Sequence, residues 1–293
     1  MENKYTGDAQ VILGAAMWGC IGLFTRIMFE IGFSTLQVIA VRAIFTSIIM
    51  LCVICFSDIK LLKFSFKDIW MFLGTGLCSF LFFNICYMNS MKHNSLSVAC
   101  ILMYTSPIWV TALSAFLFKE KLTLKKVLSL VLCVGGTALT CLNSRIEMTP
   151  AGLVYGLFSG IGYALYSIFG KYAARKYHSF TITFYTFVFA SFGAIPFCKA
   201  YILCGMLTDY KNMLLSVGIA LLITVVPYVL YTNGLSKTSA AKAAVLAIVE
   251  PVVATVVGVV VYSEPASFAG ILGIIIVAVG LLYLQHGSKG EEK

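Results

Sequence analysis

The side chain with the clearest chemical capacity is a single carboxylate, Glu250, which lies inside an otherwise apolar run. Residues 245–253 read V-L-A-I-V-E-P-V-V, so Pro251 follows the carboxylate directly. A second apolar run contains the pair Ser106-Pro107. A carboxylate in such surroundings can support the fold through an ion pair or hydrogen bond, contact a substrate, or bind a proton. The residues alone leave these three roles open.

The composition places these residues in a membrane protein. Of 293 residues, 60% are hydrophobic and 11% are charged, and the mean hydropathy is +0.95. A hydrocarbon core about 30 Å thick needs roughly 20 apolar residues for each helical crossing. We therefore predict an all-α integral membrane protein with ten spans, at Ala9–Met28, Ser34–Phe56, Ile69–Met91, Leu96–Phe118, Leu124–Leu142, Ala151–Tyr172, Phe180–Leu203, Met213–Leu235, Ala240–Tyr262 and Ala266–Gln285. The first run is expected to be a retained helix and not a signal peptide.

Basic residues are distributed unequally between the two sides of this arrangement. The formal net charge is +9, with fifteen lysines and arginines in the loops and ends of one side and four on the other. This asymmetry follows the positive-inside rule and predicts both termini in the cytoplasm, in a multi-pass protein of the plasma membrane. It explains the basic character without a nucleic-acid partner. Arg42, deep in the second span, is expected to have a structural partner inside the bundle.

The ten cysteines fall within or at the edge of the predicted spans. In an apolar helix cysteine behaves as a small hydrophobic residue. We therefore expect no metal site.

The two proline pairs fall near the middle of their spans. Proline lacks a backbone N–H and frees the carbonyl four residues before it, which is that of Met103 for Pro107 and that of Ala247 for Pro251. Lipid cannot satisfy these groups, so a neighbouring helix or a water-filled cavity must do so. Kinking that only shapes the helix is the alternative. A cavity is also where an ionised Glu250 is tolerated.

A set of aromatic and small polar residues is expected near this depth. We predict that Glu250 binds substrate together with Trp18, Asn84, Tyr87, Tyr104, Thr105, Ser106, Tyr163, Tyr166 and Tyr228. Tyrosine and tryptophan offer an apolar ring with one polar atom, which suits the wall of a ligand pocket. The alternative is a belt at the lipid headgroups, to which we assign residues nearer the span ends, such as Tyr283.

The sequence repeats itself with an offset of 144 residues. Tyr87 falls on Tyr231, Pro107 on Pro251 and Glu120 on Glu264. The chain is therefore predicted to contain two five-helix halves, residues 1–143 and 144–293. Because each half has an odd number of spans, the second half starts on the opposite side of the membrane. Inverted repeats that meet at a midplane site are the architecture of many secondary transporters.

Two further patterns concern helix ends and helix packing. Glu120 and Glu264 each follow an apolar run, and each is expected to cap the N-terminus of the next helix. Gly152, Gly156 and Gly160 form successive G-x-x-x-G steps, which predict close packing of the sixth span against a neighbour.

Two segments resemble the paired signatures of the drug/metabolite transporter superfamily, EamA-type branch. They are L-M-Y-T-S-P-I-W-V-T-A-L-S-A-F-L-F-K-E-K-L-T (residues 102–123) and L-A-I-V-E-P-V-V-A-T-V-V-G-V-V-V-Y-S-E-P-A (residues 246–266). The resemblance implies ten helices with both termini inside, a central cavity and alternating access, commonly for the export of amino acids or other small metabolites. The signature positions are Pro107, Glu120, Pro251 and Glu264, and Arg42 resembles the family's usual arginine.

The sequence thus predicts a secondary transporter, and more specifically an exporter of an amino acid or amine, with protons as a candidate coupling ion. A nucleobase, nucleotide sugar or cationic drug is the alternative cargo, and an intramembrane enzyme is a more remote alternative. The pair Gly170-Lys171 lacks the rest of a phosphate-binding loop, so ATP is not expected to drive transport. We expect no cofactor, a small-molecule substrate, contact with the lipid bilayer, and a monomer or weak dimer.

Overall fold

The computed structural model describes residues 4–141, 148–263 and 267–286, and this part of the chain is helical and contains no strand. Residues 4–141 form α1 (Lys4–Gly19), α2 (Ile21–Ile31), α3 (Thr35–Ser57), α4 (Ile69–Leu73), α5 (Phe82–His93), α6 (Leu96–Met103), α7 (Ser106–Leu117) and α8 (Leu124–Cys141). The later residues form α9 (Pro150–Ala174), α10 (Ser179–Ala194), α11 (Ala200–Leu207), α12 (Tyr210–Ala220), α13 (Val226–Lys237), α14 (Ala240–Leu246), α15 (Val249–Tyr262) and α16 (Phe268–His286). Short 3-10 turns are η1 (Ile59–Leu62), η2 (Phe66–Asp68) and η4 (Ile195–Phe197), and π-helical turns are η3 (Gly74–Leu81) and η5 (Leu221–Val225).

Ten helical segments within the described residues are long and apolar enough to cross a membrane. Each coincides with a predicted span, which confirms the ten-span, all-helical fold. Two of the predicted boundary residues, Leu142 and Ala266, lie outside the described residues.

The predicted end of the seventh span, Leu203, is wrong. The helix α10 ends at Ala194, and α11 is a separate short helix. Pro196 has no N–H to continue the helical ladder. Lys199 has a φ of 51° in the left-handed region, which turns the chain away from the axis of α10.

Interruptions occur at corresponding places in the fourth and ninth spans, as the sequence predicts. In the fourth span α6 ends at Met103 and α7 begins at Ser106, and in the ninth α14 ends at Leu246 and α15 begins at Val249. Proline is tolerated in the first turn of a helix, where its missing N–H would have no partner. Each break therefore places the start of a new helix inside the bundle.

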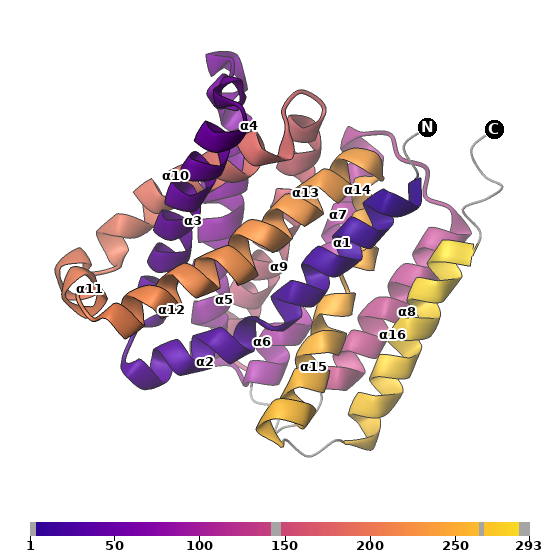
Figure 1. Ribbon diagram of the computed structural model, residues 1–293. Coiled ribbons are helices and arrows are strands. Elements are labelled where there is room, and N and C mark those ends of the chain that lie inside the picture. Colours follow the sequence, from indigo (N-terminus) through magenta and orange to yellow (C-terminus); the bar gives the residue numbers. More distant parts are fainter. Residues whose placement is uncertain (1–3, 142–147, 264–266, 287–293) are drawn as a thin grey trace.

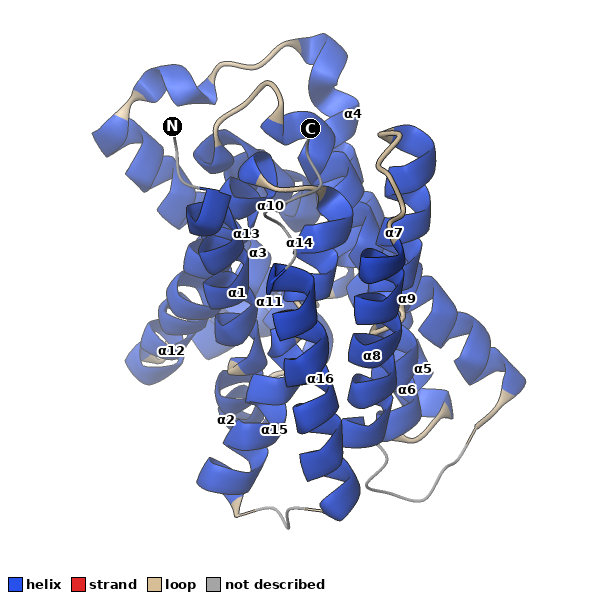
Figure 2. Cartoon of the chain, turned by 90° about the vertical axis from the view of Figure 1, so that its right-hand side faces the viewer, coloured by secondary structure: helices blue, strands red, loops and turns tan. Residues whose placement is uncertain are grey.

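Helices from corresponding positions of the repeat pack against each other. Figure 1 shows α8 beside α16 at one edge of the molecule and α3 near α10 at the other, and Figure 2 shows α8 and α16 again from the side. At the first of these edges the Cys133 thiol lies 3.8 Å from the Val277 carbonyl oxygen. At the second, the hydroxyl oxygens of Ser47 and Ser191 are 3.3 Å apart. Both pairs are separated by 144 residues.

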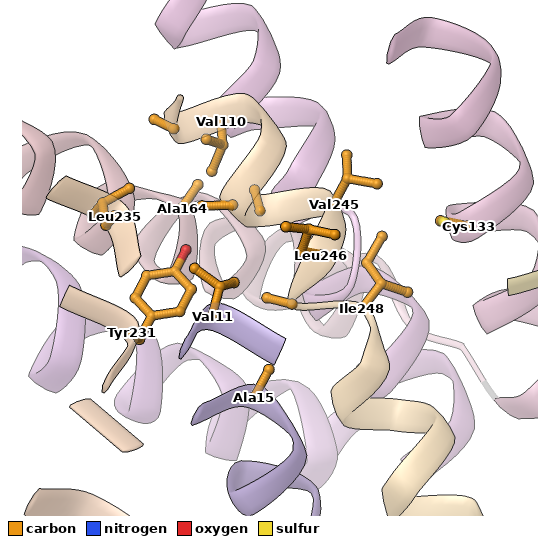
Figure 3. Close-up of a cluster of buried hydrophobic side chains, with 14 of the residues drawn as sticks. Val11, Ala15, Val110, Cys133, Ala164, Tyr231, Leu235, Val245, Leu246 and Ile248 are labelled. Atoms are coloured by element: carbon orange, nitrogen blue, oxygen red, sulfur yellow. The ribbon is translucent and has the colours of Figure 1, made fainter. Parts of the chain in front are cut away.

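The helix α14 lies at the centre of one apolar cluster. All seven of its residues are buried, and it packs against α1, α7, α9 and α13. Figure 3 shows Leu246 of α14 near Val11 and Ala15 of α1 and near Tyr231 of α13. A second cluster joins α3 and α10 to η5. The spans of the two halves are thus packed into one bundle.

Close approach of α8 and α16 yields a prediction, because two adjacent glycines of α8 differ in their surroundings. A Cβ added to Gly136 would lie 2.8 Å from the carbonyl oxygen of Gly273, whereas one added to Gly135 meets nothing within 4 Å. We expect Gly136→Ala to lower the thermal unfolding temperature of the purified protein by several degrees, since overpacking costs about 1–3 kcal/mol.

The matched control is Gly135→Ala, which should leave the unfolding temperature unchanged or raise it, because alanine favours a helix by about 1 kcal/mol over glycine. Equal unfolding temperatures for the two variants would contradict the tight contact between α8 and α16.

Candidate functional site

The Glu250 carboxylate is held by two tyrosines from different parts of the chain. The hydroxyl of Tyr163 in α9 donates to Oε2 at 2.6 Å, and that of Tyr104, at the end of α6, donates to Oε1 at 3.4 Å. Within the described residues no lysine, arginine or histidine nitrogen lies within 4 Å of this carboxylate. Glu250 is thus a partly buried acid with hydroxyl donors and without a bound cation.

The helix break places this carboxylate in the first turn of α15. Unpaired N–H groups at a helix N-terminus stabilise a negative charge, so the break itself favours a carboxylate here. The N–H of Glu250 donates to the Ala247 carbonyl at 3.0 Å. The expectation that the Ala247 carbonyl must find a partner on another helix or in water is therefore wrong, because a tight turn at the break satisfies it locally.

A cavity of about 460 Å³ lies on the side of Tyr104 and Pro251. Its walls come from α6, α8, α15 and α16, with Cys100, Tyr104, Thr140, Cys141, Pro251, Ala254, Thr255, Val256, Val259, Val260, Ser267, Gly270, Ile271 and Ile274. We call it the vestibule. It occupies the half of the molecule where α15 ends and α16 begins, at the bottom of Figure 1. Its volume is within the usual range for small-molecule sites.

A second, smaller cavity of about 20 Å³ lies beyond Tyr163. Its walls are almost entirely aromatic, with Trp18, Ser79, Phe80, Phe83, Tyr163, Tyr166, Ser167, Tyr228 and Tyr231. We call it the inner chamber. It has room for about one water molecule. Glu250 contacts a wall residue of each cavity, Tyr104 of the vestibule and Tyr163 of the inner chamber.

The chamber wall is a set of tightly packed rings. The ring centroid of Tyr228 lies 4.9 Å from that of Trp18 and 5.0 Å from that of Tyr166, in edge-to-face geometry. The hydroxyl oxygen of Tyr166 is 2.6 Å from the Thr232 hydroxyl oxygen, and that of Tyr231 is 2.7 Å from the Ser167 hydroxyl oxygen. The structure therefore brings Trp18, Tyr166 and Tyr228 together at one cavity. Their role in substrate binding stays a prediction.

Arg42 is buried beside Phe80, one of the wall residues of this chamber. Its side chain is 7% exposed, Nε donates to the Thr224 hydroxyl at 3.2 Å, and the guanidinium carbon lies 5.4 Å from the ring centroid of Phe80. Thr224 is the polar partner that the sequence analysis expected without naming it. The π-helical turn η5 carries Thr224 into the bundle.

Four other predicted binding residues do not line either cavity themselves. Asn84 donates to the Phe80 carbonyl of its own helix at 2.6 Å, the Tyr87 hydroxyl lies 3.0 Å from the Cys100 sulfur, and the Thr105 hydroxyl donates to the Leu102 carbonyl at 2.6 Å. Ser106 is buried beside Pro107 at the start of α7. Substrate binding by these four residues stays a prediction.

The opposite end of the bundle, where α1 begins and α16 ends, is closed by polar contacts. The Glu120 carboxylate accepts from the backbone N–H groups of Ala240 at 2.9 Å and Ala241 at 3.4 Å. Glu120 thus caps α14, and the prediction that it caps the next helix, α8, is wrong. Capping depends on which N-terminus is nearest in space, and sequence proximity does not determine that. Glu264 lies outside the described residues.

A buried ion pair at the same end was missed. Lys242 Nζ lies 2.6 Å from a carboxylate oxygen of Asp8, and both side chains are at most 8% exposed. Lys171 Nζ donates to the carbonyls of Leu235 at 2.8 Å and Thr238 at 2.5 Å. Lys171 and Lys242 are among the fifteen basic residues that the sequence analysis assigns to the loops and ends of one side. Asp8 and Lys242 are 234 positions apart. No local sequence pattern indicates that two charged residues so far apart form an ion pair.

The glycine steps of the sixth span do pack closely. A Cβ added to Gly160 would lie 2.7 Å from both the Leu102 carbonyl oxygen and the Thr105 hydroxyl oxygen. The helix α9, which carries Tyr163, therefore lies directly against the break between α6 and α7. This close approach brings Tyr163 near Tyr104 and Glu250.

Comparison with known proteins agrees with this architecture. Residues 5–142 and 150–284 match the sequence model of the EamA-like transporter family. The chain belongs to this family. The predicted resemblance to the drug/metabolite transporter superfamily is confirmed, and this EamA-like protein is a multi-pass membrane transporter that acts on a small-molecule substrate in the lipid bilayer.

Relatives of this EamA-like protein carry transporter names. An uncharacterized transporter of Archaeoglobus fulgidus is 27% identical over 279 residues, which cover 94% of this chain and 95% of that protein. The pseudopaline exporter CntI of Pseudomonas aeruginosa is 25% identical over 207 residues, 70% of this chain and 72% of that protein. A solved crystal structure with 16% identity has a TM-score of 0.81 and covers 97% of both chains, so it shares the fold.

The vestibule assignment gives a prediction that compares two tyrosines. We expect Tyr104→Ala to weaken substrate binding at least about tenfold, because it removes a vestibule wall and a hydrogen bond to Glu250, which is worth about 1.5–3 kcal/mol when one partner is charged. Tyr283→Ala is the control, since Tyr283 is 43% exposed on the outside of α16. Binding to the purified protein is the measurement, and equal losses for both variants would contradict the vestibule as a binding site.

Proposed function

We propose that this transporter exports a small amine-bearing metabolite, such as an amino acid, with Glu250 as the group that receives its ammonium. The observation that carries the proposal is the geometry of Glu250. Its carboxylate is inside the bundle, bonded by Tyr104 and Tyr163, and has no cation of the protein within 4 Å in the described part. An uncompensated intramembrane carboxylate marks a transport pathway more often than a structural contact.

The proposed mechanism is alternating access between two inverted halves, residues 1–143 and 144–293. Three features recur at the offset of 144 and support it: the breaks before α7 and α15, the π-helical turns η3 and η5, and the contacts between α8 and α16. The α8 and α16 contacts are also reciprocal. Gly136 approaches Gly273, and the equivalent positions Gly280 and Ser129 approach each other in the same way. Reciprocal contacts are the mark of a two-fold arrangement.

In this proposal the structure is one end of such a cycle. The vestibule is open where α15 ends, whereas α14 is buried on all sides. Leu96, at the start of α6, occupies the position equivalent to Ala240 of α14 and is 61% exposed. From the lysine distribution we propose that α1 begins in the cytoplasm, so that the vestibule faces outward. Both polar closures of the cytoplasmic end, Glu120 with α14 and Asp8 with Lys242, join the first half to the second.

A proton is the proposed coupling ion. Glu250 can bind a proton or an ammonium group, and occupancy by one excludes the other. Exchange of a proton for the cargo at one carboxylate would couple their movements without a second site. The two tyrosine hydroxyls stabilise the ionised form and leave the acid without a competing cation.

The test is substitution of the carboxylate by its neutral isostere. We expect Glu250→Gln to reduce amine or amino-acid transport in proteoliposomes to background, because the amide cannot neutralise an ammonium or exchange a proton. The variant should still be expressed and elute as a single species, since glutamine retains acceptor oxygen for the tyrosine hydroxyls.

Glu30→Gln is the matched control, because Glu30 is an exposed residue of α2 and its loss should leave transport unchanged. Normal transport by Glu250→Gln, or equal inhibition in both variants, would count against the proposed role.

A further inference from the structure

Arg42 is a buried cation whose charge is not neutralised by a carboxylate of the protein. No carboxylate oxygen lies within 4 Å of it in the described part of the chain. Its hydrogen bond there is made through Nε, to Thr224, so the two Nη groups are left without a protein acceptor. An arginine that is 7% exposed and has no carboxylate partner is an unusual structural element, because buried charges are normally paired.

Wall residues of the inner chamber contact both this cation and the Glu250 carboxylate. The guanidinium carbon of Arg42 lies 5.4 Å from the ring centroid of Phe80, which lines the chamber. Tyr163 lines the same chamber and bonds to Glu250. The protein thus holds one positive and one negative group against wall residues of the same aromatic chamber, and the two do not form an ion pair within the described residues.

From this arrangement we infer that the site has two poles and selects a zwitterion. The ammonium of the ligand binds Glu250, its carboxylate binds the Nη groups of Arg42, and Phe80 and Tyr228 enclose the atoms between them. The inference rests on the proposed function, because it assumes that Glu250 receives an amine. It adds that Arg42 is the specificity-determining residue that requires a carboxylate on the same molecule.

The physical basis is that one neutral ligand satisfies both buried charges at once. Guanidinium groups bind carboxylates through two parallel hydrogen bonds, and such charge-assisted pairs are the strong ones. An amine without a carboxylate would leave the positive charge of Arg42 without a partner. An acid without an ammonium would leave the negative charge of Glu250 without one. Discrimination through an unsatisfied buried group is steeper than discrimination through shape.

The chamber has to enlarge for this ligand, since it now holds about one water molecule. The vestibule provides the approach, because Tyr104 lines it and bonds to Glu250. Movement of the aromatic wall on binding would alter the surroundings of Trp18, which lines the chamber. Trp18 fluorescence is therefore a local reporter of binding once Trp70 and Trp109 are replaced by phenylalanine.

The experiment compares matched ligand triplets on the full chain in lipid nanodiscs. Each triplet contains an amino acid, the amine that lacks its carboxylate and the acid that lacks its ammonium: phenylalanine, phenethylamine and 3-phenylpropionate, with the leucine and lysine series in parallel. We expect at least one amino acid to bind the otherwise unaltered protein about tenfold or more tightly than its amine and its acid, which is the difference that one charge-assisted contact supplies.

Arg42→Gln should weaken the binding of that amino acid by a similar factor and leave the affinity for the amine within about threefold. Arg42→Lys keeps the positive charge and should therefore retain part of the preference for the amino acid over the amine. The lysine variant also shows that loss of folding is not the cause. If an amine binds as tightly as its amino acid, or if Arg42→Gln weakens the binding of both equally, Arg42 does not bind the ligand's carboxylate. Either result would contradict this inference but not the proposed transport of an amine at Glu250. Failure of all nine ligands to bind would contradict the proposed function together with this inference.

Discussion

Inside a bilayer, a carboxylate and interrupted helices are stable only where protein or water satisfies their polar atoms. The rest of the structure depends on this constraint. The breaks before α7 and α15 expose helix ends inside the bundle, and Glu250 occupies one of them. Tyr104 and Tyr163 then supply hydroxyl groups, and the glycines of α9 allow the approach that brings them into reach. The vestibule lies beside these groups, since Tyr104 lines it and bonds to Glu250.

The two ends of the bundle differ in how they are held. On the side where α1 begins, a carboxylate caps α14, and Asp8 and Lys242 form a buried pair. A buried ion pair is weak evidence for stability, because desolvation of both charges offsets their attraction. Such a contact is well suited to a closure that must also open. On the other side, residues of α15 and α16 line the vestibule. The proposed cycle exchanges these two arrangements, so the energy of each closed end has to remain small enough for the other to compete.

Much of the fold was predictable from the sequence because the bilayer imposes a strong pattern. Ten apolar runs predicted the ten spans. Pro107 and Pro251 predicted the helix breaks, because proline interrupts the helix in which it lies. The partner of Glu120, the meeting of Asp8 with Lys242 and the π-helical turn that presents Thr224 to Arg42 were not predictable. Each depends on which distant helices become neighbours, and a single sequence does not encode that in any local pattern. In the candidate site, depth in the span predicted which aromatic rings lie close together. Asn84 and Tyr87 bond to wall residues of the cavities and do not line them, because depth does not fix the direction of a side chain.

The central claim is that Glu250 is reached from one face of the membrane at a time. The most direct measurement is modification of Glu250 by a water-soluble carbodiimide in right-side-out and inside-out vesicles, quantified by mass spectrometry of the peptide that contains it. The account predicts modification from the outer face in the state described here, modification from the inner face once transport begins, and protection by cargo at both. Failure of the reagent to reach Glu250 from either face, or access from a single face throughout transport, would contradict it.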